Sequence, residues 1–307
     1  MASRRSVVLF VALAVVWGSA FVAIKAGLDA FPPVLFAAIR YDIAAVLMVG
    51  YAGLTSDYWL PRTRADWLTL AVEGTLIIAL YNAFLFVGQQ GVTSGVAAIL
   101  IGMSPLFSTG FSRLLLPSER LTPLGLFGLL LGLVGVAFVA RPDPTRTLGS
   151  QVLPSLLVLS AAIAVALGSV LVQRLDGGIS SSGMVAWSTV IGAGLLHAIS
   201  LALPGESLTD AEFSALGVAA VLYLAVFASA IGYVVYFDLL DRLGAIHINL
   251  VSYAAPVVAA LTGWLLLGER LGPLDVLGFL VIVTGFALLK RHALAAELDW
   301  LPAGRRR

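Results

Sequence analysis

Hydrophobic residues in this chain form long uninterrupted blocks that short polar connections separate. Each block is about 17 to 24 residues long, the length of an α-helix that crosses the hydrocarbon core of a bilayer. A membrane β-barrel would instead show segments of about ten residues with alternating polarity. The pattern predicts an all-α integral membrane protein with ten transmembrane helices. The predicted spans are Val7–Gly27, Val34–Leu54, Trp67–Val87, Val92–Leu115, Leu124–Ala140, Val152–Gln173, Ser182–Leu203, Ser214–Phe237, Ile246–Leu267 and Leu274–Lys290.

The composition supports a membrane protein and excludes several other classes. Of 307 residues, 60% are hydrophobic and 11% are charged, whereas a soluble domain has roughly 45–50% and roughly 25%. The net charge of +1 gives no indication of nucleic-acid binding. Cysteine is absent, which excludes disulfides and cysteine-ligated metals. Without a Walker A motif, a zinc-protease motif or a serine-nucleophile turn, we expect no enzyme, no cofactor and no metal.

The Lys and Arg residues predict the orientation in the membrane. With the N-terminus in the cytoplasm, 13 of them fall in inner loops and 4 in outer loops, as the positive-inside rule requires. We therefore expect a multi-pass protein of the plasma membrane with both termini cytoplasmic. Arg4 and Arg5 before an apolar block resemble a secretion signal, but this block is long enough to span, so we expect it to be retained.

An internal repeat divides the chain. Residues 114–123 read LLLPSERLTP and residues 265–273 read LLLGERLGP, so Glu119 and Glu269 are equivalent positions, 150 apart. The repeat predicts two five-helix halves, 1–143 and 150–307, the second ending in a short cytoplasmic tail. Because five is odd, the halves have opposite orientations in the membrane. Inverted repeats are typical of secondary transporters.

The same residues carry a family resemblance. WGSAFVAIKAGLDAFPPVLFAAIRYDIAA at 17–45, together with the two Glu-Arg-Leu-x-Pro turns, resembles an EamA-family transporter of the drug/metabolite transporter superfamily. The resemblance covers nearly the whole chain and implies a central cavity between the halves and efflux or exchange of small metabolites without ATP, often in amino acid transport. The first turn departs from the pattern, because Pro117 and Ser118 stand where the second copy has Gly268.

Charged residues inside the spans are the first candidates for function, since they are expensive in a membrane. Arg40 and Asp42 project from nearly opposite faces of the second span and need separate partners. Arg40 either binds a substrate carboxylate or clamps backbone carbonyls. Lys25 either pairs with Asp42 or extends to the membrane surface.

Two carboxylates are candidates for ion coupling, Asp42 and Glu73. Glu73 either accepts a coupling proton or pairs with Arg62 or Arg64 in a hydrated vestibule. His197 either titrates near neutrality or is an interfacial residue.

The glutamates of the repeated turns and the prolines before them are interpreted mainly as structural residues. Glu119 and Glu269 are interpreted as caps of the following helix starts or as turn residues. Pro105 and Pro256 lie near the middle of the fourth and ninth spans and kink them. They are interpreted as hinge or cavity-shaping residues, the alternative being static kinks. Glycines in the fifth and tenth spans permit close helix packing or a dimer face.

Uncharged polar and aromatic residues complete the predicted substrate site. They share mid-membrane positions or ring chemistry suited to a polar organic solute, although each is also compatible with packing or, for tryptophan, with an interfacial belt. Trp59 and Trp67 are assigned to that belt. The predicted substrate-binding residues are Trp17, Arg40, Tyr81, Asn82, Trp187, Tyr233, Asn249, Ser252 and Tyr253.

These observations predict a secondary transporter for small polar metabolites, amino acids or related compounds, working by alternating access. The expected partners are a small-molecule substrate and the lipid bilayer, with no nucleic acid, and the expected state is a monomer or homodimer. A broad exporter of drugs or amines stays open, as does a passive channel or lipid scramblase.

Overall fold

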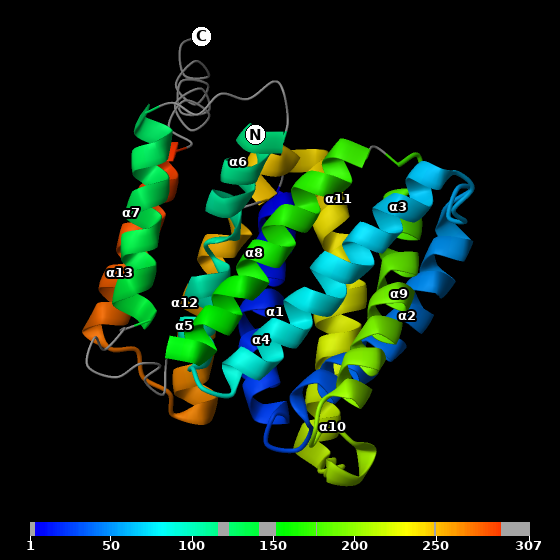
Figure 1. Cartoon of the computed structure of the whole chain (residues 1–307), viewed down its shortest axis with the longest axis horizontal. Coiled ribbons are helices and arrows are strands. Elements are labelled where there is room, and N and C mark those ends of the chain that lie inside the picture. Colours follow the sequence, from blue (N-terminus) through cyan, green and yellow to red (C-terminus); the bar gives the residue numbers. More distant parts are fainter. Residues whose placement is uncertain (1–3, 116–122, 141–151, 176, 249, 290–307) are drawn as a thin grey trace.

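The computed structural model describes residues 4–115, 123–140, 152–175, 177–248 and 250–289. This part of the chain is helical throughout and contains no strand, so the predicted all-α architecture is confirmed (Figure 1). Its α-helices are α1 (Arg4–Gly27), α2 (Pro33–Thr55), α3 (Arg64–Val72), α4 (Tyr81–Gln89), α5 (Ser94–Ile101), α6 (Ser104–Leu115), α7 (Pro123–Ala140), α8 (Val152–Leu175), α9 (Ser181–Ala202), α10 (Ala215–Leu222), α11 (Gly232–Ile248), α12 (Val251–Leu267) and α13 (Pro273–Leu289). Two π-helical segments are η1 (Glu73–Leu80) and η3 (Tyr223–Ile231), and η2 (Leu208–Asp210) is a short 3₁₀ turn.

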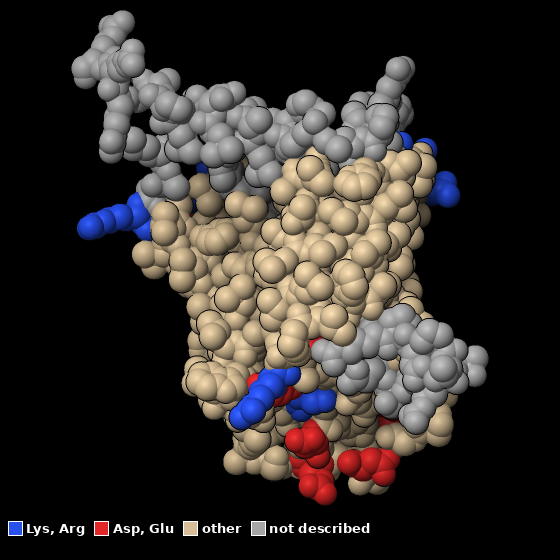
Figure 2. All heavy atoms as spheres, turned by 90° about the vertical axis from the view of Figure 1, so that its left-hand side faces the viewer, with Lys and Arg blue, Asp and Glu red and all other residues tan. Residues whose placement is uncertain are grey.

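The surface is that of a protein embedded in lipid. Among the described residues, 7 helices are long and apolar enough to cross a membrane, and 3 shorter apolar helices accompany them. Large apolar side chains are exposed along these helices, including Val46 at 74% and Leu54 at 89%. On the face in Figure 2, charged residues lie toward the two ends, with an uncharged belt between them. Such a belt is stable in hydrocarbon and unfavourable in water, so the chain is a multi-pass membrane protein.

Most of the tight helix pairs join segments distant in sequence. α2 packs on α9, α1 on α12, α4 on α8 and α7 on α13. Figure 1 shows α7 and α13 side by side at one edge of the bundle and α2 and α9 together toward the other. Each of these pairs takes one helix from before residue 143 and one from after residue 150. The interior is therefore built largely between the two parts of the chain.

Glycines allow the closest of these contacts. A Cβ added to Gly278 in α13 would lie 2.6 Å from the carbonyl oxygen of Gly135 in α7, and one added to Gly135 would lie 2.7 Å from the carbonyl oxygen of Gly278. Backbone atoms of two helices cannot move apart as a flexible side chain can. The close packing of these glycines is therefore required for the α7–α13 pair.

Gly278→Ala is expected to lower the melting temperature of the purified protein, because overpacking of this kind costs about 1–3 kcal/mol. Gly194→Ala is the matched control, since a Cβ there meets nothing within 4 Å. Alanine favours the helix over glycine by up to about 1 kcal/mol, so the control should melt at the same or a slightly higher temperature. Equal melting temperatures for the two variants would contradict the packing argument.

Two of the predicted helices differ in outline from the structure. The fourth predicted block is broken at Gly102–Met103, so Pro105 stands in the first turn of α6, where its missing N–H leaves no hydrogen bond unmade. The eighth was predicted to end at Phe237, but α11 continues past it and turns only at Gly244, whose φ is 78°. The charged residues that marked the predicted end stay helical, because Asp238 and Arg242 pair one turn apart at 2.8 Å.

The two π-helical segments were not predicted. They begin at residues 73 and 223, 150 positions apart, the same offset as the repeated glutamates. A π-helix leaves carbonyl groups without their usual partners, and such segments are frequent at functional sites. Here side chains supply donors. Asn82 Nδ2 donates to the Ile78 carbonyl at 2.7 Å, and Trp17 Nε1 donates to the Ala228 carbonyl at 3.1 Å.

Candidate functional site

A cluster of polar side chains from four segments surrounds Arg40 inside the bundle. Arg40 Nη2 donates to the Tyr41 hydroxyl at 3.3 Å and to Ser229 Oγ of η3 at 3.1 Å. The Tyr41 hydroxyl also accepts from Asn82 Nδ2 at 3.2 Å and lies 3.5 Å from the Tyr233 hydroxyl. We call Arg40, Tyr41, Asn82, Ser229 and Tyr233 the Arg40 cluster. It connects α2, α4, η3 and α11.

The Arg40 cluster has unused hydrogen-bonding capacity. Arg40 is only 7% exposed, and its Nε has no hydrogen-bond partner, nor has the buried Oδ1 of Asn82. No carboxylate in the described part of the chain forms an ion pair with Arg40. The guanidinium lies instead over the rings of Tyr41 and Phe86, with Cζ 4.6 and 5.6 Å from their centroids. A buried, uncompensated cation with a free donor is a site for an anion.

Glu73 lies near the Arg40 cluster and is itself buried. Its Oε2 accepts a hydrogen bond from Ser188 Oγ of α9 at 2.9 Å. The Tyr233 hydroxyl interacts electrostatically with both Arg40 and Glu73, which places the carboxylate on the same side of the bundle interior. The alternative pairing of Glu73 with Arg62 or Arg64 is wrong, since no ion pair among the described residues joins Glu73 to either one, and Arg62 lies over the ring of Tyr58, with Cζ 4.8 Å from its centroid.

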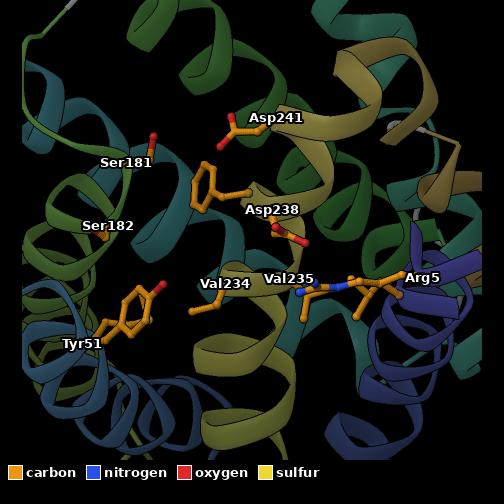
Figure 3. Close-up of a pocket in the computed structure, with 11 residues that line it drawn as sticks. Arg5, Tyr51, Ser181, Ser182, Val234, Val235, Asp238 and Asp241 are labelled. Atoms are coloured by element: carbon orange, nitrogen blue, oxygen red, sulfur yellow. The ribbon is translucent and has the colours of Figure 1, made fainter. Parts of the chain in front are cut away.

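A cavity of about 420 Å³ opens at the end of the molecule where α1 begins, here called the N-terminal face (Figure 3). Helices α1, α2, α9 and α11 line it. The lining residues are Arg5, Leu9, Met48, Tyr51, Ser181, Ser182, Val234, Val235, Phe237, Asp238 and Asp241. Figure 3 shows Tyr51 and Arg5 on opposite sides of Val234 and Val235, with both aspartates on the same helix.

Two residues of the cavity wall lie on the same helices as members of the Arg40 cluster. Val234 in its wall follows Tyr233 in sequence, and Met48 packs in one apolar cluster with Tyr233. Tyr41 and Met48 lie two turns apart on one face of α2, about 10 Å along the helix. The cavity therefore opens at the N-terminal face, and its wall comes within about two helical turns of the Arg40 cluster, although no residue of that cluster lines it.

The opposite end of the bundle is closed by contacts between helices. Lys25 Nζ donates to the carbonyls of Gln89 and Gln90 at 3.0 Å each. Both carboxylate oxygens of Glu269 accept from the Ser94 backbone N–H, at 3.0 and 3.1 Å. Gln89 Nε2 donates to the Phe21 carbonyl. In the described part of the chain, the cavity opens at one end and these contacts join the helices at the other.

These contacts correct the predicted pairing of Lys25 with Asp42. Lys25 binds free carbonyls at the C-terminus of α4, a favourable place for a cation. Asp42 lies 2.8 Å from His197 Nε2 of α9, and both side chains are about half exposed on the outer surface of the bundle, at 49% and 41%. Asp42 and Arg40 thus belong to different sides of α2.

Removing the Lys25 ammonium is expected to loosen the closed end. In Lys25→Met, an introduced thiol at the start of α5, Val96→Cys, should react faster with a membrane-impermeant maleimide. We expect an increase on the order of tenfold, from the loss of hydrogen bonds to a charged group. The natural chain has no cysteine, so this thiol is unique, and Arg174→Met serves as a control at the other end. An unchanged labelling rate in Lys25→Met would show that this contact does not hold the end closed.

Glutamates hold helix starts at this closed end, but not where they were expected. Glu269 was predicted to cap the helix that follows it, whereas it caps α5, and Asp275 accepts from Gly272 N at the start of α13. Glu206, which was not predicted, accepts from Val34 N at 3.0 Å and Leu35 N at 2.8 Å. Glu269 and Glu206 thus bind free N–H groups of distant helices, whereas Asp275 caps its own helix. Glu119 lies outside the described residues.

The other predicted substrate residues lie in three places. Tyr81 is close to the Arg40 cluster and interacts electrostatically with Tyr41 and Arg40. Trp17 stacks on Tyr236 at 5.4 Å between ring centroids while it donates to η3. Trp187 belongs with the interfacial tryptophans, stacking on Trp59 and donating to its carbonyl at 3.0 Å.

The predicted residues of the ninth span do not join the Arg40 cluster. Tyr253 packs against Phe286 of α13, with 4.6 Å between ring centroids, and its buried hydroxyl has no partner. The Ser252 carbonyl lies near Gly102, at the break between α5 and α6. Among the described residues, no hydrogen bond or ring contact links either one to Arg40. Pro256 is buried inside α12, and Asn249 lies outside the described residues.

Sequence reasoning missed three members of this region, Tyr41, Ser229 and Ser188. Tyr41 stands between Arg40 and Asp42 in the sequence, and a polar residue in an apolar span is a signal that could have marked it. Serines give a weaker signal, because they are common in membrane helices as packing residues. Only the fold shows that Ser229 and Ser188 face charged groups.

Comparison with known proteins identifies the family. A model described as the EamA-like transporter family matches residues 4–141 and again residues 153–291. The "uncharacterized inner membrane transporter YedA" of Escherichia coli is 32% identical over 91% of this chain and 88% of its own length. The "uncharacterized transporter YvbV" of Bacillus subtilis is 28% identical over 95% of this chain and 94% of its own.

Two further matches concern substrate and fold. The "probable amino-acid metabolite efflux pump" of Escherichia coli is 28% identical over 92% of this chain and 94% of its own length. A solved crystal structure matches with a TM-score of 0.64, 20% identity and coverage of 96% of this chain and all of that one, which shows the shared fold alone.

Fold and comparisons together define a multi-pass helical transporter of the membrane. The chain belongs to the EamA-like transporter family. The resemblance predicted from residues 17–45 and the two Glu-Arg-Leu-x-Pro turns is confirmed.

Proposed function

We propose that this protein is a secondary transporter that exports or exchanges small metabolites bearing a carboxylate, amino acids or close relatives, across the plasma membrane. The observation that carries the proposal is the buried Arg40 guanidinium with a free Nε and no carboxylate partner in the described chain. A substrate carboxylate would accept the unused N–H donors and neutralise the charge. Asn82 Oδ1, also unpartnered, would accept from a substrate N–H or O–H group.

The arrangement of helix contacts supports ten spans in two inverted five-helix repeats. Contacts between the first repeat and the second have counterparts in which each helix is replaced by the equivalent helix of the other repeat. The α1–α12 contact has its counterpart in the contact of α8 with α5 and α6, and the η1–α9 contact has its counterpart in α2–η3. The matching positions of η1 and η3 and the two family matches point the same way. The proposed repeats are 1–143 and 150–307.

Such a pair of halves supports alternating access. The cavity at the N-terminal face and the contacts of Lys25 and Glu269 at the opposite end support this proposal. Exchanging the conformations of the two inverted halves would close the cavity and open the end that Lys25 and Glu269 hold. The positive-inside rule assigns the open end to the cytoplasm, with both termini there. The structure then represents an inward-open state, ready to load a substrate for export.

Counterflow in proteoliposomes tests this function. Vesicles are loaded with one of a panel of unlabelled amino acids, amines or non-amino carboxylates, and uptake of the labelled form is followed. Saturable, solute-specific exchange of a carboxylate is the expected result. Exchange of cationic amines alone would instead identify an amine exporter, and non-saturable flux without exchange would identify a channel or a scramblase.

A further inference from the structure

A second hollow lies next to the cavity of the N-terminal face. It is an apolar groove of about 210 Å³ between α2 and the η3–α11 segment. Its lining residues are Leu47, Met48, Tyr51, Ala230, Ile231 and Val234. Met48, Tyr51 and Val234 also line the main cavity. The groove and the cavity are therefore adjacent parts of one hollow region.

The outer side of the groove faces the hydrocarbon of the bilayer. Leu47 is 41% exposed and Ile231 is 46% exposed, and both lie within helices long and apolar enough to cross a membrane. Exposed apolar side chains at such positions contact lipid tails. A molecule dissolved in the membrane thus meets the groove directly, without passing through water.

The groove lies near the guanidinium along both of its walls, although no residue of the Arg40 cluster lines it. Leu47 follows Arg40 by seven residues, two helical turns, so it shares a face of α2 with Arg40 about 10 Å away. Ala230 follows Ser229, which accepts the hydrogen bond from Arg40 Nη2. The groove thus has lipid on its outer side and lies within about two helical turns of the buried cation.

We infer that the substrate is an amphiphilic organic acid, whose acidic head binds Arg40 while its apolar chain or ring lies in the groove between α2 and η3–α11. This inference rests on the proposed role of Arg40 and narrows the substrate class to carboxylates with an apolar tail. Such a molecule would enter sideways from the lipid leaflet at the N-terminal face. Its tail stays in apolar surroundings throughout, and only its head loses water, in exchange for hydrogen bonds to the guanidinium.

Binding of two probes to the protein in lipid nanodiscs tests the inference. The probes are radiolabelled N-acetylglycine and N-decanoylglycine, which share a head and differ in tail, with binding to empty nanodiscs subtracted. Ile231→Trp fills the groove, and Leu47→Trp fills it from the other wall should the first variant fold poorly. Leu54→Trp is the control, because Leu54 is 89% exposed on the same helix α2 but does not line the groove.

The expected result is selective loss of the long-tailed ligand. Filling the groove should weaken binding of N-decanoylglycine by about tenfold or more, which is the order of effect expected when a ligand must enter an overpacked apolar site. The cause is steric, because the tail comes from lipid and the indole ring occupies the space that the tail needs. Filling the groove should leave N-acetylglycine unchanged, and Leu54→Trp should resemble the wild type for both probes. Arg40→Gln should weaken both probes.

The failures of the two proposals are distinguishable. Unchanged binding of N-decanoylglycine in both groove-filling variants, or its absence from the wild type, would overturn the groove assignment while leaving Arg40 as a carboxylate site. Unchanged binding of both probes in Arg40→Gln would overturn the role of Arg40, on which the groove inference also depends.

Discussion

Replacing Arg40 by glutamine is expected to reduce kcat/KM for counterflow of the carboxylate substrate by about 100-fold or more. Each hydrogen bond between charged groups contributes about 1.5–3 kcal/mol, and a guanidinium offers a carboxylate two of them. Glutamine keeps much of the length of the side chain but neither the charge nor the two-pronged geometry. The measurement is the concentration dependence of counterflow in proteoliposomes that contain equal amounts of folded protein.

Two companion variants make this result specific. Arg40→Lys keeps the charge without the planar pair of donors and should fall between wild type and glutamine. Arg62→Gln makes the same change at an exposed loop residue and should transport like the wild type. An Arg40→Gln protein that folds and still transports with wild-type kcat/KM would show that the guanidinium only holds Tyr41 and Ser229 in place.

Replacing Glu73 by glutamine is expected to abolish the response of transport to a proton gradient while exchange continues. Glutamine has nearly the shape of glutamate and can still accept the hydrogen bond from Ser188, but it carries no exchangeable acidic proton. Glu73 is the better candidate of the two carboxylates predicted for coupling. It is buried near Arg40, accepts a hydrogen bond from a hydroxyl group, and pairs with no base in the described chain. The measurement compares flux with and without an imposed gradient, alongside counterflow with no gradient.

Asp42→Asn is the matched control for that experiment. Asp42 pairs with His197 on the outer surface, away from the cavity, so this variant should keep the gradient response of the wild type. Loss of the response in Asp42→Asn, with Glu73→Gln unaffected, would transfer the coupling role to the surface pair. Loss of counterflow in Glu73→Gln would instead assign Glu73 to binding, for example of a substrate ammonium group.

The close contacts of Arg40 show why the site could be predicted only in part. A single charged residue in an apolar block is expected to be buried and functional, and on that basis the sequence predicted Arg40 as a substrate residue. Its partner Ser229 is 189 positions away, and nothing local to either residue indicates that they meet. Lys25 is the counterexample, because sequence proximity suggested Asp42 whereas the fold brings it to the carbonyls of Gln89 and Gln90.

The π-helical segments illustrate a second limit. The apolar blocks around Glu73 and Tyr223 predict helix, but the same residues can form an α-helix or a π-helix with little change in local preference. In the structure, Asn82 and Trp17 donate side-chain hydrogen bonds to carbonyls of the two segments. Both residues were predicted as substrate ligands, and both have a structural hydrogen bond that their position in the sequence does not reveal.

The sequence by itself determined that this is an all-helical membrane protein of the EamA-like transporter family. Apolar blocks of bilayer length have few stable alternatives, because every backbone polar group in lipid must be satisfied within its own helix. The repeated Glu-Arg-Leu-x-Pro turns indicated the family. Only the tertiary structure decided which charges are buried without a partner, which end of the bundle is open and where lipid meets the cavity. These properties depend on contacts between distant segments, which form when the two parts of the chain pack against each other.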